Sequence, residues 1–225
     1  DNVKLMVDSY KIKSIELSLS KKFDGSKLQK KHIEFLIQDA KQQILRNYSD
    51  QNILHVVIKN YKIDNQNYTS FPENITCSLL SVDIIFICLE KKIIEDIKTI
   101  FFKLDVSINQ LFCSSYIKSL SYKDNFRSVE NISFIDMGFN KTSITCYNKK
   151  GISFFSILPI GGSHITKDLS KVLNVDLETA EKIKLSFDKD KNILDEKNIS
   201  LELVQQVIFC RVEEILELCT KQIKL

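Results

Sequence analysis

The chain has 225 residues, of which 44% are hydrophobic and 27% charged. These proportions exclude a disordered or fibrous protein and allow one large domain or two smaller lobes. The formal net charge is only +3, which gives no reason to expect nucleic-acid binding. No apolar run approaches the roughly 20 residues of a membrane span. The six cysteines include no CxxC pair, which predicts reduced thiols rather than disulfides or a zinc site.

The first hundred residues predict a small α+β unit. The predicted strands alternate apolar and polar residues or carry apolar runs, and they lie in residues 3–19 (two short strands), 53–59 and 76–90. Two amphipathic helices are predicted, one after Ser26 as its N-cap and one at residues 91–103, with a loop at residues 63–73. We expect residues 12–104 to fold as a compact unit with few contacts to the rest, and residues 84–88 to be buried on both faces of their strand.

The second half predicts a different arrangement. A helix is expected at residues 107–120, because Ile108, Leu111, Phe112 and Ser115 repeat at helical spacing, and a charged connection follows at residues 123–128. Further elements are expected in this order: strands at residues 132–136, 143–147 and 153–158, helices at 163–173 and 177–187, a polar excursion at 188–198 and a final helix. Asp176 and Ser200 are placed to cap the last two helices. Four cysteines lie in apolar patterns and are expected in the core: Cys88, Cys113, Cys146 and Cys210.

The candidate ligand-binding motifs lie between residues 131 and 187. The strand at residues 132–136 ends in Asp136-Met137-Gly138, and a turn with hydroxyl residues follows it. Gly161 and Gly162 stand directly before the next helix. Glycine permits close backbone approach, and the N–H groups of such a turn and of a helix start can bind phosphate. A plain hairpin and a plain strand-to-helix turn remain the alternatives.

These motifs, taken in order, resemble the FtsA family of bacterial cell-division proteins. The similarity includes PIGG (residues 159–162), a Thr-x-Asp helix and AEKIK (residues 180–184). It extends to LHVVIKNYKIDNQ at residues 54–66, CSSY at residues 113–116 and RVEEILEL at residues 211–218. The resemblance implies a mixed α/β chain with the actin-like ATPase fold of two lobes and the small α+β subdomain that this family inserts.

The resemblance also implies domain limits. Residues 1–105 correspond to the inserted subdomain with the end of the first lobe at its start, residues 106–122 to a helix that returns to the first lobe, and residues 129–225 to the second lobe. A subdomain of the second lobe corresponds to about residues 188–198. Family elements that hold the rest of the nucleotide, and a C-terminal amphipathic helix that anchors the family to the membrane, are expected outside the present chain.

The implied cofactor is ATP with Mg²⁺, with Asp136 orienting Mg²⁺-bound water. The residues implied to contact the nucleotide are Asp136, Gly138, Asn140, Lys141, Thr142, Ser143, Gly161, Gly162 and Glu214. The family turn reads Asp-x-Gly-Gly-Gly-Thr-Thr, whereas Phe139 and Asn140 replace two of these glycines here. Phenylalanine adopts left-handed backbone angles poorly, at about 1–2 kcal/mol, so we expect weak nucleotide binding.

The implied function is a cell-division scaffold rather than an enzyme, with weak ATPase activity at most. Such a scaffold recruits FtsZ to the cytoplasmic face of the inner membrane at the division septum, associates with itself and contacts other division proteins through the inserted subdomain. A PilM-like pilus-assembly protein or an actin-fold phosphotransferase is the alternative. The altered glycine turn argues against the phosphotransferase, and residues 54–66 and 211–218 favour the FtsA family over the pilus protein.

Overall fold

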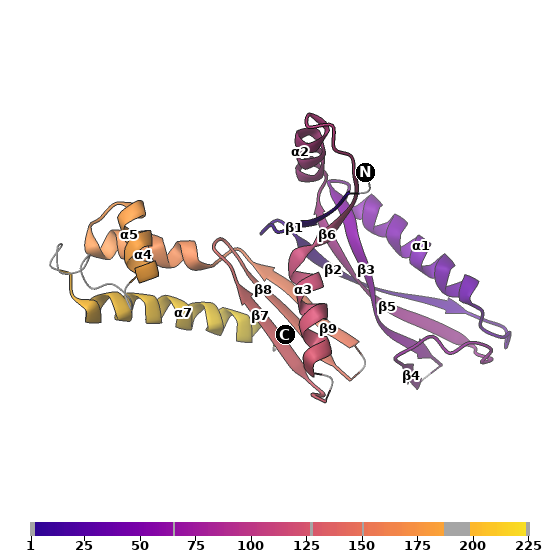
Figure 1. Cartoon of the computed structure of the whole chain (residues 1–225). Coiled ribbons are helices and arrows are strands. Elements are labelled where there is room, and N and C mark those ends of the chain that lie inside the picture. Colours follow the sequence, from indigo (N-terminus) through magenta and orange to yellow (C-terminus); the bar gives the residue numbers. More distant parts are fainter. Residues whose placement is uncertain (1–2, 65, 127, 150, 187–198, 224–225) are drawn as a thin grey trace. The chain divides into compact units, whose positions relative to one another are not determined.

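The computed structural model describes residues 3–64, 66–126, 128–149, 151–186 and 199–223. The chain divides into two compact units (Figure 1). Unit 1 consists of Asp1–Phe134 and Thr145–Ile157, and unit 2 consists of Ile135–Ile144 and Leu158–Leu225. Within the described parts, no helix combines the length and the apolar character needed to cross a membrane. The excursion predicted at residues 188–198 lies outside the described residues.

Unit 1 contains a four-stranded antiparallel sheet in the order β2-β5-β3-β4. Its strands are β2 (Lys13–Lys22), β3 (Gln51–Ile63), β4 (Gln66–Tyr68) and β5 (Leu79–Glu90). The predicted strands are confirmed, but β4 lies where we expected only loop. This short strand forms because β3 continues to Ile63 and the chain then turns back, so that Tyr61 pairs with Tyr68.

The central strand β5 is buried on both faces, as its unbroken apolar run predicted. Alternate residues from Leu80 to Cys88 pack against α1 (Lys30–Asn47), which contributes Ile33, Leu36, Ala40 and Ile44. Figure 1 shows α1 lying along the sheet. The helix starts later than predicted and is not capped by Ser26. Instead the backbone N–H of Gln29 donates to His32 Nδ1 at 3.2 Å.

The opposite face of β5 carries Ile85, Ile87 and Leu89 into a second core. This core also takes in Ile94 of α2 (Lys91–Phe102). Apart from Ile12, the other buried members come from before residue 12 and after residue 104: Val7, Leu111, Cys113, Tyr116, Tyr147, Ile152 and Phe155. Residues 12–104 therefore share a core with the remainder of unit 1, and our expectation of few contacts was wrong.

The helix predicted at residues 107–120 is a second correction. The segment folds as β6 (Ile108–Cys113) followed by α3 (Ser114–Lys123), and a short 3₁₀ turn, η1 (Asp124–Phe126), comes next. β6 pairs in parallel with β1 (Val3–Val7), so that Leu5 lies opposite Leu111. This pairing joins segments about a hundred residues apart and overrides the local helical spacing.

His55 on β3 ties this pair of strands to the main sheet. Its Nε2 accepts a hydrogen bond from the Cys113 backbone N–H at 2.8 Å, and its ring lies 4.9 Å from the Tyr116 ring. Burial lowers the pKa of His55 below its usual 6.5. An Nε2 that accepts a hydrogen bond carries no proton, so the contact requires neutral imidazole.

The three strands predicted after residue 130 are confirmed and form a sheet in the order β7-β8-β9. They are β7 (Ile132–Met137), β8 (Thr142–Asn148) and β9 (Gly151–Leu158). Helices follow as α4 (Gly162–Leu173), α5 (Leu177–Ser186) and α7 (Leu201–Ile223). These helices bury Ile165, Leu169, Ala180, Ile183 and Val204 as the core of unit 2.

Both predicted helix caps of unit 2 are confirmed. Asp176 Oδ1 accepts the Thr179 N–H at 2.9 Å, and Ser200 Oγ accepts the Leu203 N–H at 3.3 Å. All six cysteines are free thiols. Cys88, Cys113 and Cys146 are buried as expected, and burial raises the pKa of Cys88 to about 12. Cys210 is exposed, so its assignment to the core was wrong.

Candidate functional site

The turn between β7 and β8 is closed by its own backbone. The Gly138 N–H donates to the Lys141 carbonyl at 2.8 Å, which leaves Phe139 and Asn140 at the tip. Phe139 is 56% exposed, and Asn140 and Asp136 are also exposed. The turn thus presents a ring, an amide and a carboxylate to solvent.

The start of α4 is bonded directly to this turn. The Gly162 N–H donates to the Gly138 carbonyl at 2.9 Å, and the Ser163 N–H donates to the Phe139 carbonyl at 2.7 Å. Gly161 makes this approach possible. A Cβ on Gly161 would lie 2.3 Å from the Gly138 carbonyl oxygen and 2.9 Å from two further backbone atoms of the turn. The pair of glycines predicted from the sequence therefore joins the turn to α4 within unit 2.

The residues after the tip point inward. Lys141, Thr142 and Ser143 are all buried, at 5%, 0% and 2% exposure. The Thr142 hydroxyl donates to the Ile160 carbonyl at 2.8 Å, so it fixes the segment that leads into α4. The structure brings most of the predicted site residues together, but only Asp136 and Asn140 of the turn offer exposed polar side chains.

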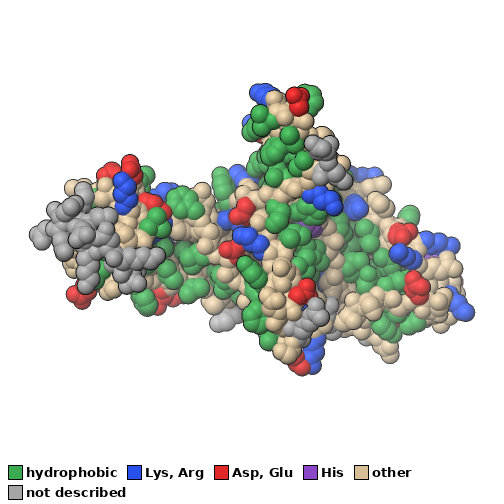
Figure 2. Space-filling model, viewed as in Figure 1, with side chains coloured by type: hydrophobic (Ala, Val, Ile, Leu, Met, Phe, Trp, Pro, Cys, Tyr) green, Lys and Arg blue, Asp and Glu red, His purple; other side chains and the backbone are tan. Residues whose placement is uncertain are grey.

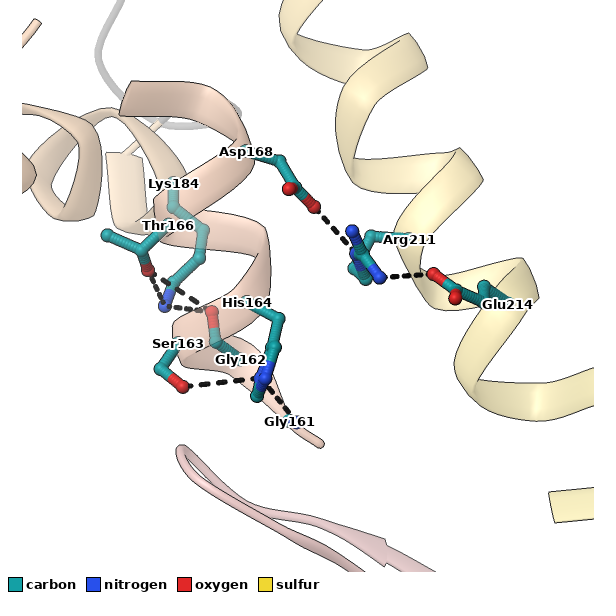
Figure 3. A network of polar contacts seen from close by, with 9 residues as sticks. All are labelled: Gly161, Gly162, Ser163, His164, Thr166, Asp168, Lys184, Arg211 and Glu214. Carbon is teal, nitrogen blue, oxygen red and sulfur yellow. Dashed lines mark hydrogen bonds and ion pairs between the residues drawn. The ribbon is translucent and has the colours of Figure 1, made fainter. Parts of the chain in front are cut away.

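A lysine of α5 completes the surroundings of the turn. Lys184 Nζ donates to the Gly162 carbonyl at 3.2 Å and to Thr166 Oγ1 at 3.0 Å (Figure 3). It also pairs with Glu181 at 2.7 Å. The same ammonium group lies 5.2 Å from the centre of the Phe139 ring, within the range of a cation–π contact. Lys184 thus connects α5, the start of α4 and the tip of the turn.

The charge of Lys184 is largely balanced. Burial raises the pKa of the Glu181 carboxyl, but hydrogen bonds from Lys184 and Thr166 and the charge of Lys184 outweigh that effect, so the pKa lies below its usual value. Sequence reasoning did not include Lys184 and Glu181 among the site residues. The AEKIK motif was the signal that could have found them. Thr166, the threonine of the Thr-x-Asp motif, is buried in this network.

Glu214 has a different setting. It lies on α7 and pairs with Arg211, whose Nε also donates to Asp168 of α4 at 2.6 Å (Figure 3). The hydrogen bond to Asp168 raises the pKa of Arg211, so this guanidinium remains charged. These three side chains border a groove of about 500 Å³ between α4 and α7. The described contact of Glu214 therefore ties α7 to α4 through Arg211.

The polar groups expected to contact a phosphate differ in how accessible they are. Asp136 is exposed at the end of a strand, where a carboxylate can orient metal-bound water. In contrast, the first two N–H groups of α4, which a phosphate would use, are bonded to carbonyls of the turn. An anion that used these donors would first have to displace the turn.

Comparison with solved structures defines the class of protein. A PilM–PilN complex of type IV pilus biogenesis matches with a TM-score of 0.59 at 12% identity, covering 92% of this chain and 56% of that one. At this identity the likeness concerns the fold alone. Together with the turn, the strand order and the inserted α+β elements, it identifies the actin-like ATPase fold that the sequence predicted.

The family follows from two further matches. The family model "Cell division protein FtsA" matches residues 133–207, and "SHS2 domain inserted in FTSA" matches residues 10–88. The chain belongs to the FtsA family of cell division proteins.

Curated relatives agree with this assignment. FtsA of Buchnera aphidicola subsp. Schizaphis graminum is 25% identical over an alignment that covers 94% of this chain and 57% of the relative. FtsA of Helicobacter pylori (strain ATCC 700392 / 26695) is 29% identical over 139 residues, or 62% of this chain and 28% of the relative. The chain thus spans between about a quarter and three fifths of the length of these relatives.

Proposed function

We propose that this chain is part of a cell-division scaffold that recruits FtsZ to the cytoplasmic face of the membrane at the division septum and associates with itself. Membership of the FtsA family over both the inserted and the second-lobe segments supports this proposal. In this proposal the inserted subdomain at residues 1–105 contacts other division proteins, and the second-lobe segment at residues 129–225 carries the nucleotide-responsive turn.

The chemistry of the turn supports a conformational role rather than turnover. The single observation that carries this point is the bonding of the Gly162 and Ser163 N–H groups to the turn itself. A phosphate that captured these donors would exchange one set of hydrogen bonds for another, and the turn would move relative to α4. Nucleotide binding would then select between two arrangements of the turn, which is how a ligand shifts a conformational equilibrium.

We propose ATP with Mg²⁺ as the ligand, held weakly. Asp136 would face the metal-bound water, and the backbone of Gly138 and Asn140 would approach the phosphates. Lys184 keeps an ammonium group close to the turn, although Glu181 already balances much of its charge. When bound, Mg²⁺–ATP would supply a charged group that both the turn and α4 can contact, and the residues of the chain position it without a catalytic base.

Co-sedimentation with FtsZ polymers tests the proposal. The 225-residue chain should pellet with GTP-assembled FtsZ of the same organism and remain in the supernatant without it. Asp136→Ala should weaken pelleting only modestly, because much of the backbone cradle is already occupied. Glu178→Ala is a matched control, since it removes an exposed carboxylate from the same unit.

Each result has a clear reading. If the folded wild-type chain does not pellet with FtsZ, either alone or with Mg²⁺–ATP, then the recruiting role proposed for this part of the protein is wrong. If Asp136→Ala abolishes pelleting while circular dichroism shows an intact fold, the turn is an essential nucleotide switch and its weak-binding assignment fails.

A further inference from the structure

The positive charge of the protein is concentrated in one short segment. Residues 21–35 contain five lysines and two acidic residues, a net charge of +3. The whole chain also carries +3, so the remaining 210 residues are electrically neutral as a group. The segment joins the end of β2 to the first turns of α1 in unit 1.

These side chains lie at one end of unit 1, where β2 leads into α1, and we name them the lysine patch. It consists of Lys21, Lys22, Lys27, Lys30, Lys31 and Phe35. Lys22, Lys27, Lys30 and Lys31 are exposed, and no ion pair with these lysines occurs among the residues that the structure describes. No acidic residue lies in the first turn of α1. Figure 2 shows basic side chains at this end of unit 1, near the right edge of the view.

Aromatic rings are interleaved with these charges. The Phe35 ring is 59% exposed, and Lys21 Nζ lies 4.6 Å from its centre and 5.8 Å from that of Phe23. Phe23 in turn lies 4.9 Å from the His32 ring. Burial lowers the pKa of His32, and the charges of Lys31 and Lys21 lower it further, which reports a positive local potential.

We propose that the lysine patch binds the surface of an anionic lipid bilayer. Clustered lysines gain from the negative surface potential of such a membrane, and an exposed phenylalanine beside them can enter the headgroup region. The unpaired charges make the surface complementary to an anionic plane. This inference goes beyond the proposed recruitment of FtsZ and does not depend on it.

Vesicle flotation with the 225-residue chain tests the proposal without any partner protein. The probe is a phosphatidylcholine vesicle with about a third phosphatidylglycerol, compared with phosphatidylcholine alone at low and physiological salt. The chain should float only with the anionic vesicles, and less at higher salt because counterions screen the attraction. If the chain does not float with anionic vesicles at low salt, the proposal is wrong.

Matched substitutions locate the contact. Replacement of Lys22, Lys27, Lys30 and Lys31 by Gln should weaken binding by about fivefold for each lysine that reaches the surface, and so by about 25-fold if only two do. The control replaces by Gln four exposed lysines of α2 and of the residue directly after it: Lys91, Lys92, Lys98 and Lys103. Both variants change the net charge equally, so equal losses would show a general charge effect and refute a specific patch.

The contribution of Phe35 to binding distinguishes a membrane from an acidic protein segment as the partner of the lysine patch. Phe35→Ser should reduce vesicle binding severalfold, whereas Phe102→Ser, which alters a ring that is 77% exposed on α2, should leave it unchanged. Both positions are on the surface, so the variants should retain the wild-type circular dichroism. If the chain instead binds poly-glutamate with the same lysine dependence and does not float with vesicles, the patch serves an acidic partner and the lipid assignment is wrong.

Discussion

The close backbone approach between Gly161 and the β7–β8 turn gives the most specific stability prediction. In Gly161→Ala the new Cβ would lie 2.3 Å from the Gly138 carbonyl oxygen, and the other close atoms also belong to the backbone. No side chain can move aside, so the turn and α4 must separate. Separation breaks the Gly162–Gly138 and Ser163–Phe139 hydrogen bonds. At about 0.5–1.5 kcal/mol each, with added strain, the free energy of unfolding should fall by about 2–4 kcal/mol.

Gly162→Ala is the matched control for this prediction. Its Cβ would meet Lys184 Nζ at 3.5 Å, which is an ordinary contact with the end of a flexible side chain. Gly162 begins α4, where alanine is favoured over glycine by up to about 1 kcal/mol. We therefore expect Gly162→Ala to be neutral or stabilising, and the two variants to differ by roughly 3 kcal/mol.

Urea unfolding followed by circular dichroism at 222 nm measures this difference. All seven tyrosines lie in unit 1 and the chain has no tryptophan, so tyrosine emission reports unit 1 while the helical signal includes unit 2. Gly161→Ala should shift the dichroism midpoint more than the tyrosine midpoint. Equal stability of the two glycine variants would refute the close-approach argument, because the same chemical change would then have no dependence on position.

Three further predictions concern stability and binding. Burial in the folded state lowers the pKa of His55, so its stabilising contact with Cys113 should be present above pH 6.5 and be lost as the pH falls. The urea midpoints detected by tyrosine emission should therefore drop between pH 7.5 and 5.5. In His55→Gln the drop should be smaller. Leu36→Asp, at a side chain that is 3% exposed, should cost at least about 3 kcal/mol and abolish recruitment of FtsZ, whereas Leu45→Asp, at 41% exposure, should cost under about 1 kcal/mol in thermal melts. Mg²⁺–ATP should bind the 225-residue chain with a dissociation constant of about a millimolar or weaker by calorimetry, since each 1.4 kcal/mol of lost contacts costs about tenfold.

A different result would contradict each of these three predictions. An equal pH response of wild type and His55→Gln would show that another group carries the acid sensitivity. Loss of stability at Leu45 comparable to that at Leu36 would contradict the assignment of the α1 faces. Micromolar ATP affinity would show that the turn opens readily and that its internal hydrogen bonds are not the barrier proposed above.

The local sequence pattern was sufficient to predict a helix or strand, and its buried face, wherever the apolar residues repeat with the period of that element. The apolar run of β5 predicted burial on both faces, and α1 showed its core face through Ile33, Leu36 and Ala40. The strand–turn–strand order around Asp136 and the helix caps at Asp176 and Ser200 were also readable, since capping involves residues only a few positions apart. These features depend on neighbours in the sequence.

Only the tertiary structure decided the features that depend on distant segments. Residues 108–113 have helical spacing but form β6, because β1 offers a parallel partner about a hundred residues earlier. Gly161 could be recognised as a glycine before a helix, yet its necessity comes from the Gly138 carbonyl 2.3 Å from where a Cβ would stand. Lys184 joins the turn through contacts with Gly162 and Phe139. The local sequence pattern predicted most of the elements and the family that they resemble. Packing between distant elements decided the strand β6 and which backbone donors and charges surround the turn.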